Sequence, residues 1–337
     1  MSNGSPDTPR ALKAADFEAV VEIDRRITGR SRRVFFERRL NAALADPTGF
    51  LFVAMESAGA LSGFAIARMQ NGEFGDDRRA AVLDMLGVDP DSQRGGIGGT
   101  LLGAILALMK KRDLHELRTQ VAWHDQALMP FFAAAGFSLA PRQVLERATA
   151  GGLSGSSDDN PAPDRDIAPR RLDAGMADHS GPGSDDFVAL AHDRALVRSM
   201  TADDLAAIIA IDEKLTGRAR AAYYDAKLKE VMDESGVRVS LVAEADGRRV
   251  GYIMARADYG EFGRAEPTAI IDAIGVDPGW SRSGIASALL SQLMANLEAL
   301  HVETARTTVS WNNFPLLGFL RGCGFTPAQQ LVLSLSV

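Results

Sequence analysis

The chain has 337 residues, of which 46% are hydrophobic and 24% are charged, a size and composition typical of two globular domains. Its net charge of -7 argues against a nucleic-acid partner, because nucleic-acid-binding surfaces are usually basic. The longest apolar run, Leu101 to Met109, is far shorter than the ~20 residues that span a membrane. The polar N-terminus shows no secretion signal, and the single cysteine, Cys323, permits no intrachain disulfide. We therefore expect a cytoplasmic protein that binds no membrane.

The apolar pattern of the first half of the chain predicts strands and helices in the order βααβββαβαβ. A glycine after the last apolar turn predicts a helix end at Gly29. The expected strands lie at residues 10–12, 50–56, 61–69, 79–88 and 116–122, with a last strand ending near residue 146. The expected helices lie at residues 15–26, 33–45, 100–109 and 126–135. This order indicates an α/β fold built on a mixed sheet.

The chain repeats itself, which indicates two copies of one domain. Landmarks of the first copy return 188 positions later, as from Asp84 to Asp272 (272 minus 84). The other landmarks at this spacing are Trp123 and Trp311, residues 28–30 and 216–218, and residues 72–75 and 260–263. A constant offset over such distances means that the copies have almost no insertions relative to one another.

A polar segment rich in glycine, serine and proline separates the copies. Residues 151–161 and 180–186 carry most of these residues, and such a composition cannot bury enough apolar surface to offset the entropy of ordering. We expect a first domain at residues 1–148, a flexible linker at residues 149–193 and a second domain at residues 194–337.

A glycine-rich loop joins the fourth strand of the first copy to the following helix. Its residues are Gln93, Arg94, Gly95, Gly96, Ile97, Gly98 and Gly99. Glycines allow positive φ and a close approach of the backbone to a ligand, and the N–H groups and dipole of a helix N-terminus favour phosphate. The loop has neither the Gly-Lys-Ser/Thr ending of a P-loop nor the Gly-x-Gly start of a dinucleotide fingerprint. The alternative is a strand-to-helix turn without a ligand.

The spacing Gln-x-x-Gly-x-Gly, behind a strand that ends Val-Asp-Pro, resembles the acetyl-coenzyme A pyrophosphate loop of the GCN5-related N-acetyltransferases (the GNAT superfamily). The element order resembles the GNAT fold over nearly the whole of each copy. The resemblance implies two tandem GNAT (acyl-CoA N-acyltransferase) domains, acetyl-CoA as the cofactor, and a gap between strands four and five for its pantetheine arm. It also implies a bulge near Gly87 and Gly275 that frees a backbone N–H for the thioester carbonyl. The alternative is that these glycines make room for a packed side chain.

The resemblance assigns further cofactor contacts by position. The strand positions beside the two glycines are Leu86, Val88, Ile274 and Val276. The loop of the second copy consists of Ser281, Arg282, Ser283, Gly284, Ile285, Ala286 and Ser287. Because a serine stands where the family has glutamine or arginine, we expect a weaker grip on pyrophosphate there. The helix near the end of the second copy keeps the family's asparagine, Asn313, whereas the first copy has Asp125. The tyrosine that usually protonates the thiolate is replaced by Phe132 and Leu320.

Acidic residues in both copies are candidates for the base that takes the proton of an amine. Asp84 and Asp272 lie amid apolar strand residues, where aspartate is uncommon, and the alternative is a structural aspartate. Glu73 and Glu261 lie in the repeated Gly-Glu-Phe-Gly loops, where the alternative is a solvent-facing turn residue. The histidines show no metal-ligand spacing, so we expect no metal site.

Two aromatic pairs, Phe35–Phe36 and Tyr223–Tyr224, either line an acceptor pocket or belong to the core. The arginines of the first two helices are expected on a solvated face, with recognition of an acidic acceptor or partner as the alternative; they are Arg25, Arg26, Arg30, Arg32, Arg33, Arg38 and Arg39.

The resemblance thus implies an N-acetyltransferase that moves an acetyl group from acetyl-CoA directly to a primary amine, with the help of a general base. The expected acceptor is a small molecule or a protein, and a homodimer is one expected assembly. The alternative is a non-catalytic regulatory or scaffolding protein that binds acyl-CoA.

Overall fold

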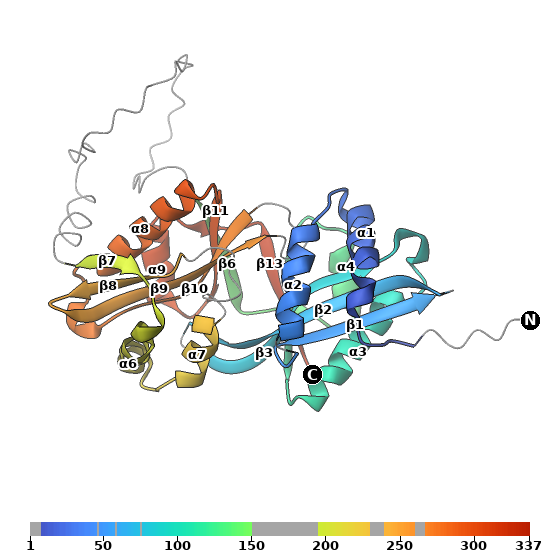
Figure 1. The fold of residues 1–337 in the computed structure, drawn as a ribbon, viewed down its shortest axis with the longest axis horizontal. Helices are drawn as coiled ribbons and strands as arrows, with labels where there is room; N and C mark the ends of the chain where they lie inside the picture. The colour runs from blue at the N-terminus through green and yellow to red at the C-terminus, as the bar shows by residue number, and fades with distance from the viewer. Residues whose placement is uncertain are drawn as a thin grey trace, which may run out of the picture.

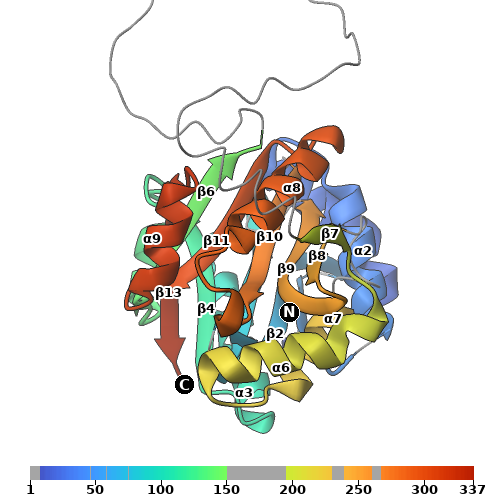
Figure 2. The same cartoon turned by 90° about the vertical axis from the view of Figure 1, so that its left-hand side faces the viewer.

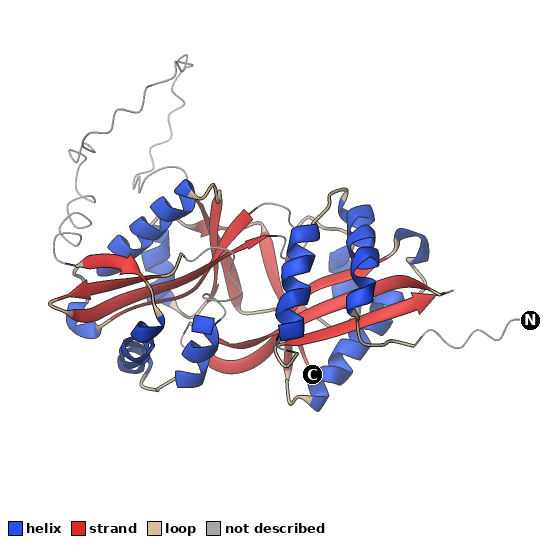
Figure 3. Ribbon diagram, viewed as in Figure 1, coloured by secondary structure: helices blue, strands red, loops and turns tan. Residues whose placement is uncertain are grey.

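The computed structural model describes residues 8–45, 47–57, 59–74, 76–149, 195–229, 239–259 and 267–337. They form two halves that lie side by side along the long axis, and each half is a mixed sheet covered by helices (Figures 1 and 3). The expected mixed α/β fold in two copies is confirmed. The expected linker, residues 149–193, lies outside the described residues except for Thr149.

The first half follows the predicted order of elements. Its helices are α1 (Phe17–Thr28), α2 (Arg33–Ala45), α3 (Ile97–Lys111) and α4 (Leu128–Ala134). Its strands are β1 (Phe50–Ser57), β2 (Ala60–Glu73), β3 (Asp76–Val88), β4 (Glu116–Ala122), β5 (Ser138–Leu139) and β6 (Arg142–Ala148). Helix α1 ends at Gly29 as expected, because the left-handed φ of +73° lets its N–H donate back to the Arg25 carbonyl. The expected strand at residues 10–12 is reduced to one bridge between Arg10 and Ala54.

The second half repeats these elements. Its helices are α6 (Leu205–Thr216), α7 (Ala221–Lys229), α8 (Ile285–Ala299) and α9 (Phe314–Gly322). Its strands are β7 (Leu196–Ser199), β8 (Leu241–Ala245), β9 (Arg248–Tyr259), β10 (Pro267–Val276), β11 (Thr304–Ser310), β12 (Thr326–Pro327) and β13 (Gln330–Ser336). Helix α6 ends at Gly217, with φ of +74°, in the same way as α1.

Each half contributes its last strand to the sheet of the other half. The first sheet has the order β1-β2-β3-β4-β13-β5, and the second has the order β12-β6-β11-β10-β9-β8-β7. The exchanged strands β13 and β6 run antiparallel to β4 and β11. In Figures 1 and 2 the green β6 lies beside β11, and the red β13 lies beside β4. The two copies are therefore consecutive in the sequence, but each sheet contains strands from both.

Apolar side chains fill the space on both faces of each sheet. In the first half, Leu101 and Ile105 of α3 pack on one face, and Phe36 of α2 packs with Phe64 on the other. The second half has an equivalent pair of clusters around α8 and around α6 and α7. The four aromatic residues Phe35, Phe36, Tyr223 and Tyr224 are at most 5% exposed, so they belong to the core.

The expectation of a solvated arginine face is wrong for Arg32 and Arg39, which are 6% and 8% exposed. The guanidinium of Arg32 donates to both carboxylate oxygens of Asp24. Arg220 and Asp212 repeat this buried ion pair in the second half. A buried guanidinium needs such a carboxylate, since burial of an uncompensated charge is very costly.

Candidate functional site

A fork between two parallel strands opens in each half. In the first half, β3 and β4 have two rungs, Ala81–Leu117 and Val82–Arg118, and the described chain shows no rung beyond them. The hydroxyl of Thr119 donates to the carbonyl of Leu83 at 3.0 Å, where the strands begin to separate. In the second half, β10 and β11 pair over residues 268–270.

The strand positions assigned to the cofactor lie on the separated parts of β3 and β10. They are Leu86, Val88, Ile274 and Val276, and all four are half-buried. Thr307 marks the start of the second fork as Thr119 marks the first, since its hydroxyl donates to the carbonyl of Ile271 at 2.9 Å. The two forks are thus built alike.

The bulge in the strand beside each fork lies at the aspartate. Met85 faces Ile66 and Leu83 faces Ala67, so Asp84 is the extra residue of β3. The register of β10 shifts at Asp272 in the same way. The expected bulge of this strand is therefore present, but it lies three residues before Gly87 and Gly275, because the position of a one-residue register shift cannot be read from a glycine alone.

Gly87 and Gly275 make room for aromatic rings instead. A Cβ at Gly87 would lie 2.7 Å from Cε1 of Phe64, and a Cβ at Gly275 would lie 2.6 Å from Cε1 of Tyr252. Real Cβ atoms do not approach this closely, so only glycine lets the ring of the neighbouring strand cross β3 or β10.

The bulge directs Asp84 into a buried pair of cations, and its side chain is 0% exposed. The Nε of Arg68 donates to Oδ1 at 3.2 Å, and the Nη2 of Arg39 lies 3.4 Å from Oδ2. These cations were not among the predicted site residues, although Arg39 lay in the arginine-rich helices. Both oxygens of Asp84 face a cation, as expected of a carboxylate that fixes its neighbours in place.

Asp272 has the same surroundings in the second half. The Nε of Arg256 donates to Oδ2 at 3.1 Å, and the Nζ of Lys227 lies 3.3 Å from Oδ1. Arg256 and Lys227 stand 188 positions after Arg68 and Arg39. The repeat in the sequence could therefore have revealed these two cationic positions.

The glycine-rich loop follows one strand of each fork and contains a left-handed turn. Arg94 has φ of +65° and Gly96 has φ of +82°; Arg282 and Gly284 repeat this with +60° and +81°. A positive φ is uncommon for arginine, so its recurrence marks a specific loop conformation. Successive N–H groups in such turns, followed by a helix N-terminus, form a concave site that binds anions.

Most of the loop is accessible from outside. Exposed residues are Gln93, Arg94, Gly95, Gly96, Gly99, Ser281 and Arg282. Half-buried residues are Ile97, Gly98, Ser283, Gly284, Ala286 and Ser287, and Ile285 is buried. The amide of Gln93 donates to the carbonyl of Val88 at 3.3 Å, which ties the loop to the end of the strand.

Helix α1 is tied by ion pairs that were not predicted to the short segment between β3 and this loop. The guanidinium of Arg26 lies 2.6 Å from Oδ2 of Asp89 and 2.9 Å from Oδ2 of Asp91. In the second half, Lys214 lies 2.6 Å from Oδ2 of Asp277, and its hydrogen bond lowers the pKa of that carboxyl. In both halves, therefore, the first helix is held against the segment that leads from the strand into the loop.

Asp125 accepts hydrogen bonds at the start of α4, and Asn313 is the N-cap of α9. Oδ1 of Asp125 accepts from the N–H of Leu128 at 2.9 Å, and Oδ1 of Asn313 accepts from the N–H of Leu316 at 3.3 Å. The residues at the family's tyrosine position are buried further along these helices, since Phe132 is 3% exposed and Leu320 is 2% exposed. Neither side chain has a hydroxyl to protonate a thiolate.

A buried network of hydroxyls distinguishes the second half from the first. The hydroxyl of Tyr252 lies 2.6 Å from that of Tyr224, which donates to Oδ1 of Asp212 at 2.9 Å. Burial is the main reason why the pKa of each tyrosine is raised, so both stay protonated at neutral pH. Phe36 and Phe64 stand at the equivalent positions of the first half.

The structure describes the backbone of Glu73, but it does not describe Glu261. Glu73 ends β2, where its backbone pairs with Asp76, whereas its side chain and all of Glu261 lie outside the described residues. The next residue, Phe74, packs against the core of the second half, so this turn reaches across to the other half.

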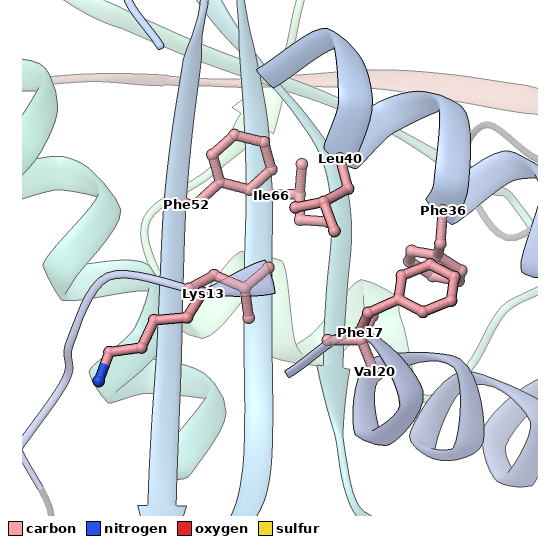
Figure 4. A pocket seen from close by; sticks show the side chains of 8 residues that line it. Lys13, Phe17, Val20, Phe36, Leu40, Phe52 and Ile66 are labelled. Atoms are coloured by element: carbon pink, nitrogen blue, oxygen red, sulfur yellow. The ribbon is translucent and has the colours of Figure 1, made fainter. Parts of the chain in front are cut away.

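An apolar pocket lies beside α1 and α2, on the face of the sheet opposite α3 (Figure 4). Phe17, Phe36, Leu40, Phe52 and Ile66 line it, and its volume is about 10 Å³. This is room for about one water molecule, so the pocket does not hold a cofactor.

The described residues form neither a metal cluster nor a membrane-spanning helix. None of their His, Cys, Asp and Glu side chains gather in a group of three that could hold a metal ion. No helix in this part of the chain is long and apolar enough to cross a bilayer.

Comparison with known proteins gives one family for both halves. A model described as the acetyltransferase (GNAT) family matches residues 17–137 and 205–325. A mycothiol acetyltransferase of Propionibacterium freudenreichii is 31% identical to this chain over 99 residues, which are 29% of this chain and 30% of that enzyme. The match thus spans less than a third of the enzyme's length.

Solved structures share the fold over nearly the whole chain. A GCN5-related N-acetyltransferase from Sphaerobacter thermophilus is 16% identical, with a TM-score of 0.58 over 99% of this chain and 97% of that chain. A tandem GNAT protein from the clavulanic acid biosynthesis pathway is 15% identical, with a TM-score of 0.60 over 98% and 97%. A glucosamine N-acetyltransferase region of a fungal GH3 β-N-acetylglucosaminidase has a TM-score of 0.62 at 14% identity, over 98% of this chain and 38% of that chain.

Proposed function

Because the chain belongs to the acetyltransferase (GNAT) family, as a member with two tandem domains, we propose that it transfers an acetyl group from acetyl-CoA to a primary amine. The acceptor is a small molecule or a protein. One observation carries the proposal: in each half, a fork between parallel strands ends at a left-handed loop and a helix N-terminus. This pair suits a cofactor that has a long arm and a pyrophosphate.

We assign the pyrophosphate of acetyl-CoA to the backbone N–H groups of Gly95 to Gly99, with Arg94 as a charged donor. The separated part of β3, around Leu86 and Val88, lines the path of the pantetheine arm. When bound, acetyl-CoA supplies the acetyl group as an activated thioester. The first half is the stronger site in this proposal, because Gln93 is replaced by Ser281 in the second half.

Transfer requires the amine nitrogen to attack the thioester carbonyl, the carbon–sulfur bond to break, and one proton to leave the amine. Asp84 and Asp272 each face two cations, so we assign them to holding those cations. The acidic candidates left for the proton are Glu73 in the first half and Glu261 in the second. Water can protonate the departing thiolate, since a thiol is only a weak acid with a pKa of about 8.5.

Two features of the residues around the forks support a second function. The aspartates beside the forks are held by cations, and Phe132 and Leu320 carry no hydroxyl. These features suit a regulatory or scaffolding protein that binds acyl-CoA without turnover. It differs from the first function in one measurable property, the release of coenzyme A.

A coenzyme A-release screen with amines, peptides and aminoglycosides tests the choice. We expect an acceptor-dependent release of coenzyme A that disappears when Gly96 and Gly284 are both replaced by aspartate. A rise in melting temperature with acetyl-CoA, together with no release for any acceptor class, would establish the second function instead.

A further inference from the structure

Two exposed tryptophans occupy equivalent positions in the two halves. Trp123 directly follows β4 and is 61% exposed, and Trp311 directly follows β11 and is 55% exposed. The third tryptophan of the chain, Trp280, packs against the core of the second half. Tryptophan is highly buried on average, so exposure of the same ring in both halves calls for a binding role.

Both rings lie at the edge of the sheet that carries the glycine-rich loop. The strands of each fork are parallel, so their carboxyl ends share one edge. The loop follows one strand of the fork, and the tryptophan follows the other. In the first half, the ring of Phe131 in α4 lies against Gly98 in the first turn of α3, where a Cβ would be 3.2 Å away. The starts of α3 and α4 are thus neighbours at this edge.

The backbone of each tryptophan is fixed by the other half of the chain. The N–H of Trp123 donates to the carbonyl of Gln329 at 3.4 Å, and the N–H of Trp311 donates to the carbonyl of Pro141 at 3.0 Å. The ring of His124 meets that of Trp123 edge-on, with centroids 6.2 Å apart. A ring held on a fixed backbone loses little entropy when a flat ligand stacks on it.

We propose that Trp123 and Trp311 are stacking platforms for the adenine ring of the cofactor. The proposal rests on the proposed function, which makes acetyl-CoA the donor. With its pyrophosphate at the loop, the pantetheine arm runs back into the fork, and the adenosine is left at the edge where the tryptophans stand. Adenine has a flat π face that stacks on aromatic side chains. In the second half, Phe314 is 75% exposed and adds apolar surface three residues beyond Trp311.

Intrinsic fluorescence tests the platform directly in a Trp280→Phe protein, where the two proposed platforms are the remaining tryptophans. We expect acetyl-CoA and ADP to quench the emission, and acetylpantetheine, which lacks adenosine, to leave it unchanged. Trp123→Phe and Trp311→Phe in this background should each remove the part of the quenching that belongs to one half. Equal quenching by acetylpantetheine and acetyl-CoA would overturn the proposal.

Calorimetry of the whole 337-residue chain gives the second measurement. Trp123→Ala together with Trp311→Ala should weaken acetyl-CoA binding roughly tenfold and leave acetylpantetheine binding unchanged. Leu139→Ala is the matched control, since Leu139 is 59% exposed on β5, and it should change neither affinity. Unaltered acetyl-CoA affinity in the double variant would overturn the stacking proposal and leave the proposed function standing. If the wild-type protein gives no heat with acetyl-CoA, the proposed function itself fails.

Discussion

The side-chain amide of Gln120 donates a hydrogen bond to the hydroxyl of Thr308 at 3.3 Å, and the two residues are 188 positions apart, the spacing of the repeat. Equivalent residues contact one another only close to the axis that relates the copies, so this axis passes between β4 and β11. Hydrogen bonds of the exchanged segments obey the same symmetry. The N–H of Ala140 donates to Val332, and that of Ala328 donates to Val144, both at 2.9 Å.

The exchange of strands predicts that neither half is stable alone. A fragment of residues 194–337 lacks β6, which lies between β11 and β12, so its sheet is interrupted. We expect this fragment to be unfolded or aggregated by circular dichroism and size-exclusion chromatography, and co-expression with residues 1–148 to restore a folded complex. A folded, monomeric fragment would contradict this prediction.

Gly96→Asp should abolish acetyl-CoA binding in the first half. The substitution places a negative charge at the loop whose N–H groups are assigned to the pyrophosphate, and like charges repel. Titration calorimetry should then show only the site of the second half. Gly59→Asp is the control, because Gly59 has a similar φ of +80° and an added Cβ there would also meet no atom within 4 Å, but it lies in the turn between β1 and β2. Equal loss in both variants would point to backbone strain.

Asp84→Asn should mainly lower stability. The variant leaves Arg39 and Arg68 buried beside a neutral amide, and breaking a buried ion pair costs about 3–5 kcal/mol. Denaturant unfolding measures this cost, and coenzyme A release measures the chemistry in parallel. Glu73→Gln should show the opposite pattern, with native stability and lost turnover in the first half. If Asp84→Asn keeps its stability and loses turnover, Asp84 is the base after all.

Tyr224→Phe should destabilise the second half by about 1–3 kcal/mol, because the buried Asp212 loses a hydrogen-bond donor. The first half provides the comparison, since Phe36 occupies this position and Asp24 pairs there with Arg32. Phe36→Tyr should give a smaller gain, because the new hydroxyl would face Asp24 on one side but the ring of Phe64, in place of the hydroxyl of Tyr252, on the other. Urea denaturation of both variants checks the prediction, and an unchanged midpoint for Tyr224→Phe would refute it.

Asp204 should make the second half sensitive to acid. The hydrogen bonds of Arg198, at 2.7 and 2.8 Å, lower the pKa of this carboxyl below its usual range. Its stabilisation is therefore complete above the unfolded-state pKa of about 3.9 and is lost as the pH falls toward the folded-state value. Asp204→Asn should cost about 2 kcal/mol at pH 7, with a smaller difference from the wild type at pH 3. Melting temperatures of both proteins at the two pH values decide this.

The loop and the order of elements could be read from the sequence because both depend on local residue types. The glycines around position 96 predict a left-handed turn before a helix, and the apolar periods specify α3 and β3. The position of the bulge, at Asp84, was missed because it depends on the register with β2, which a single strand does not encode. The exchange of β6 and β13 was missed for a related reason, since a strand pattern indicates a buried strand without indicating its neighbour.

The reciprocal position of β6 and β13 makes the chain equivalent to a dimer whose two subunits are joined covalently. Dilution cannot separate the halves, and neither sheet can lose its inserted strand without opening the other. Heat should therefore melt both halves in one calorimetric transition. A destabilising substitution near one fork should lower the melting temperature of the whole chain, even where the other fork is untouched.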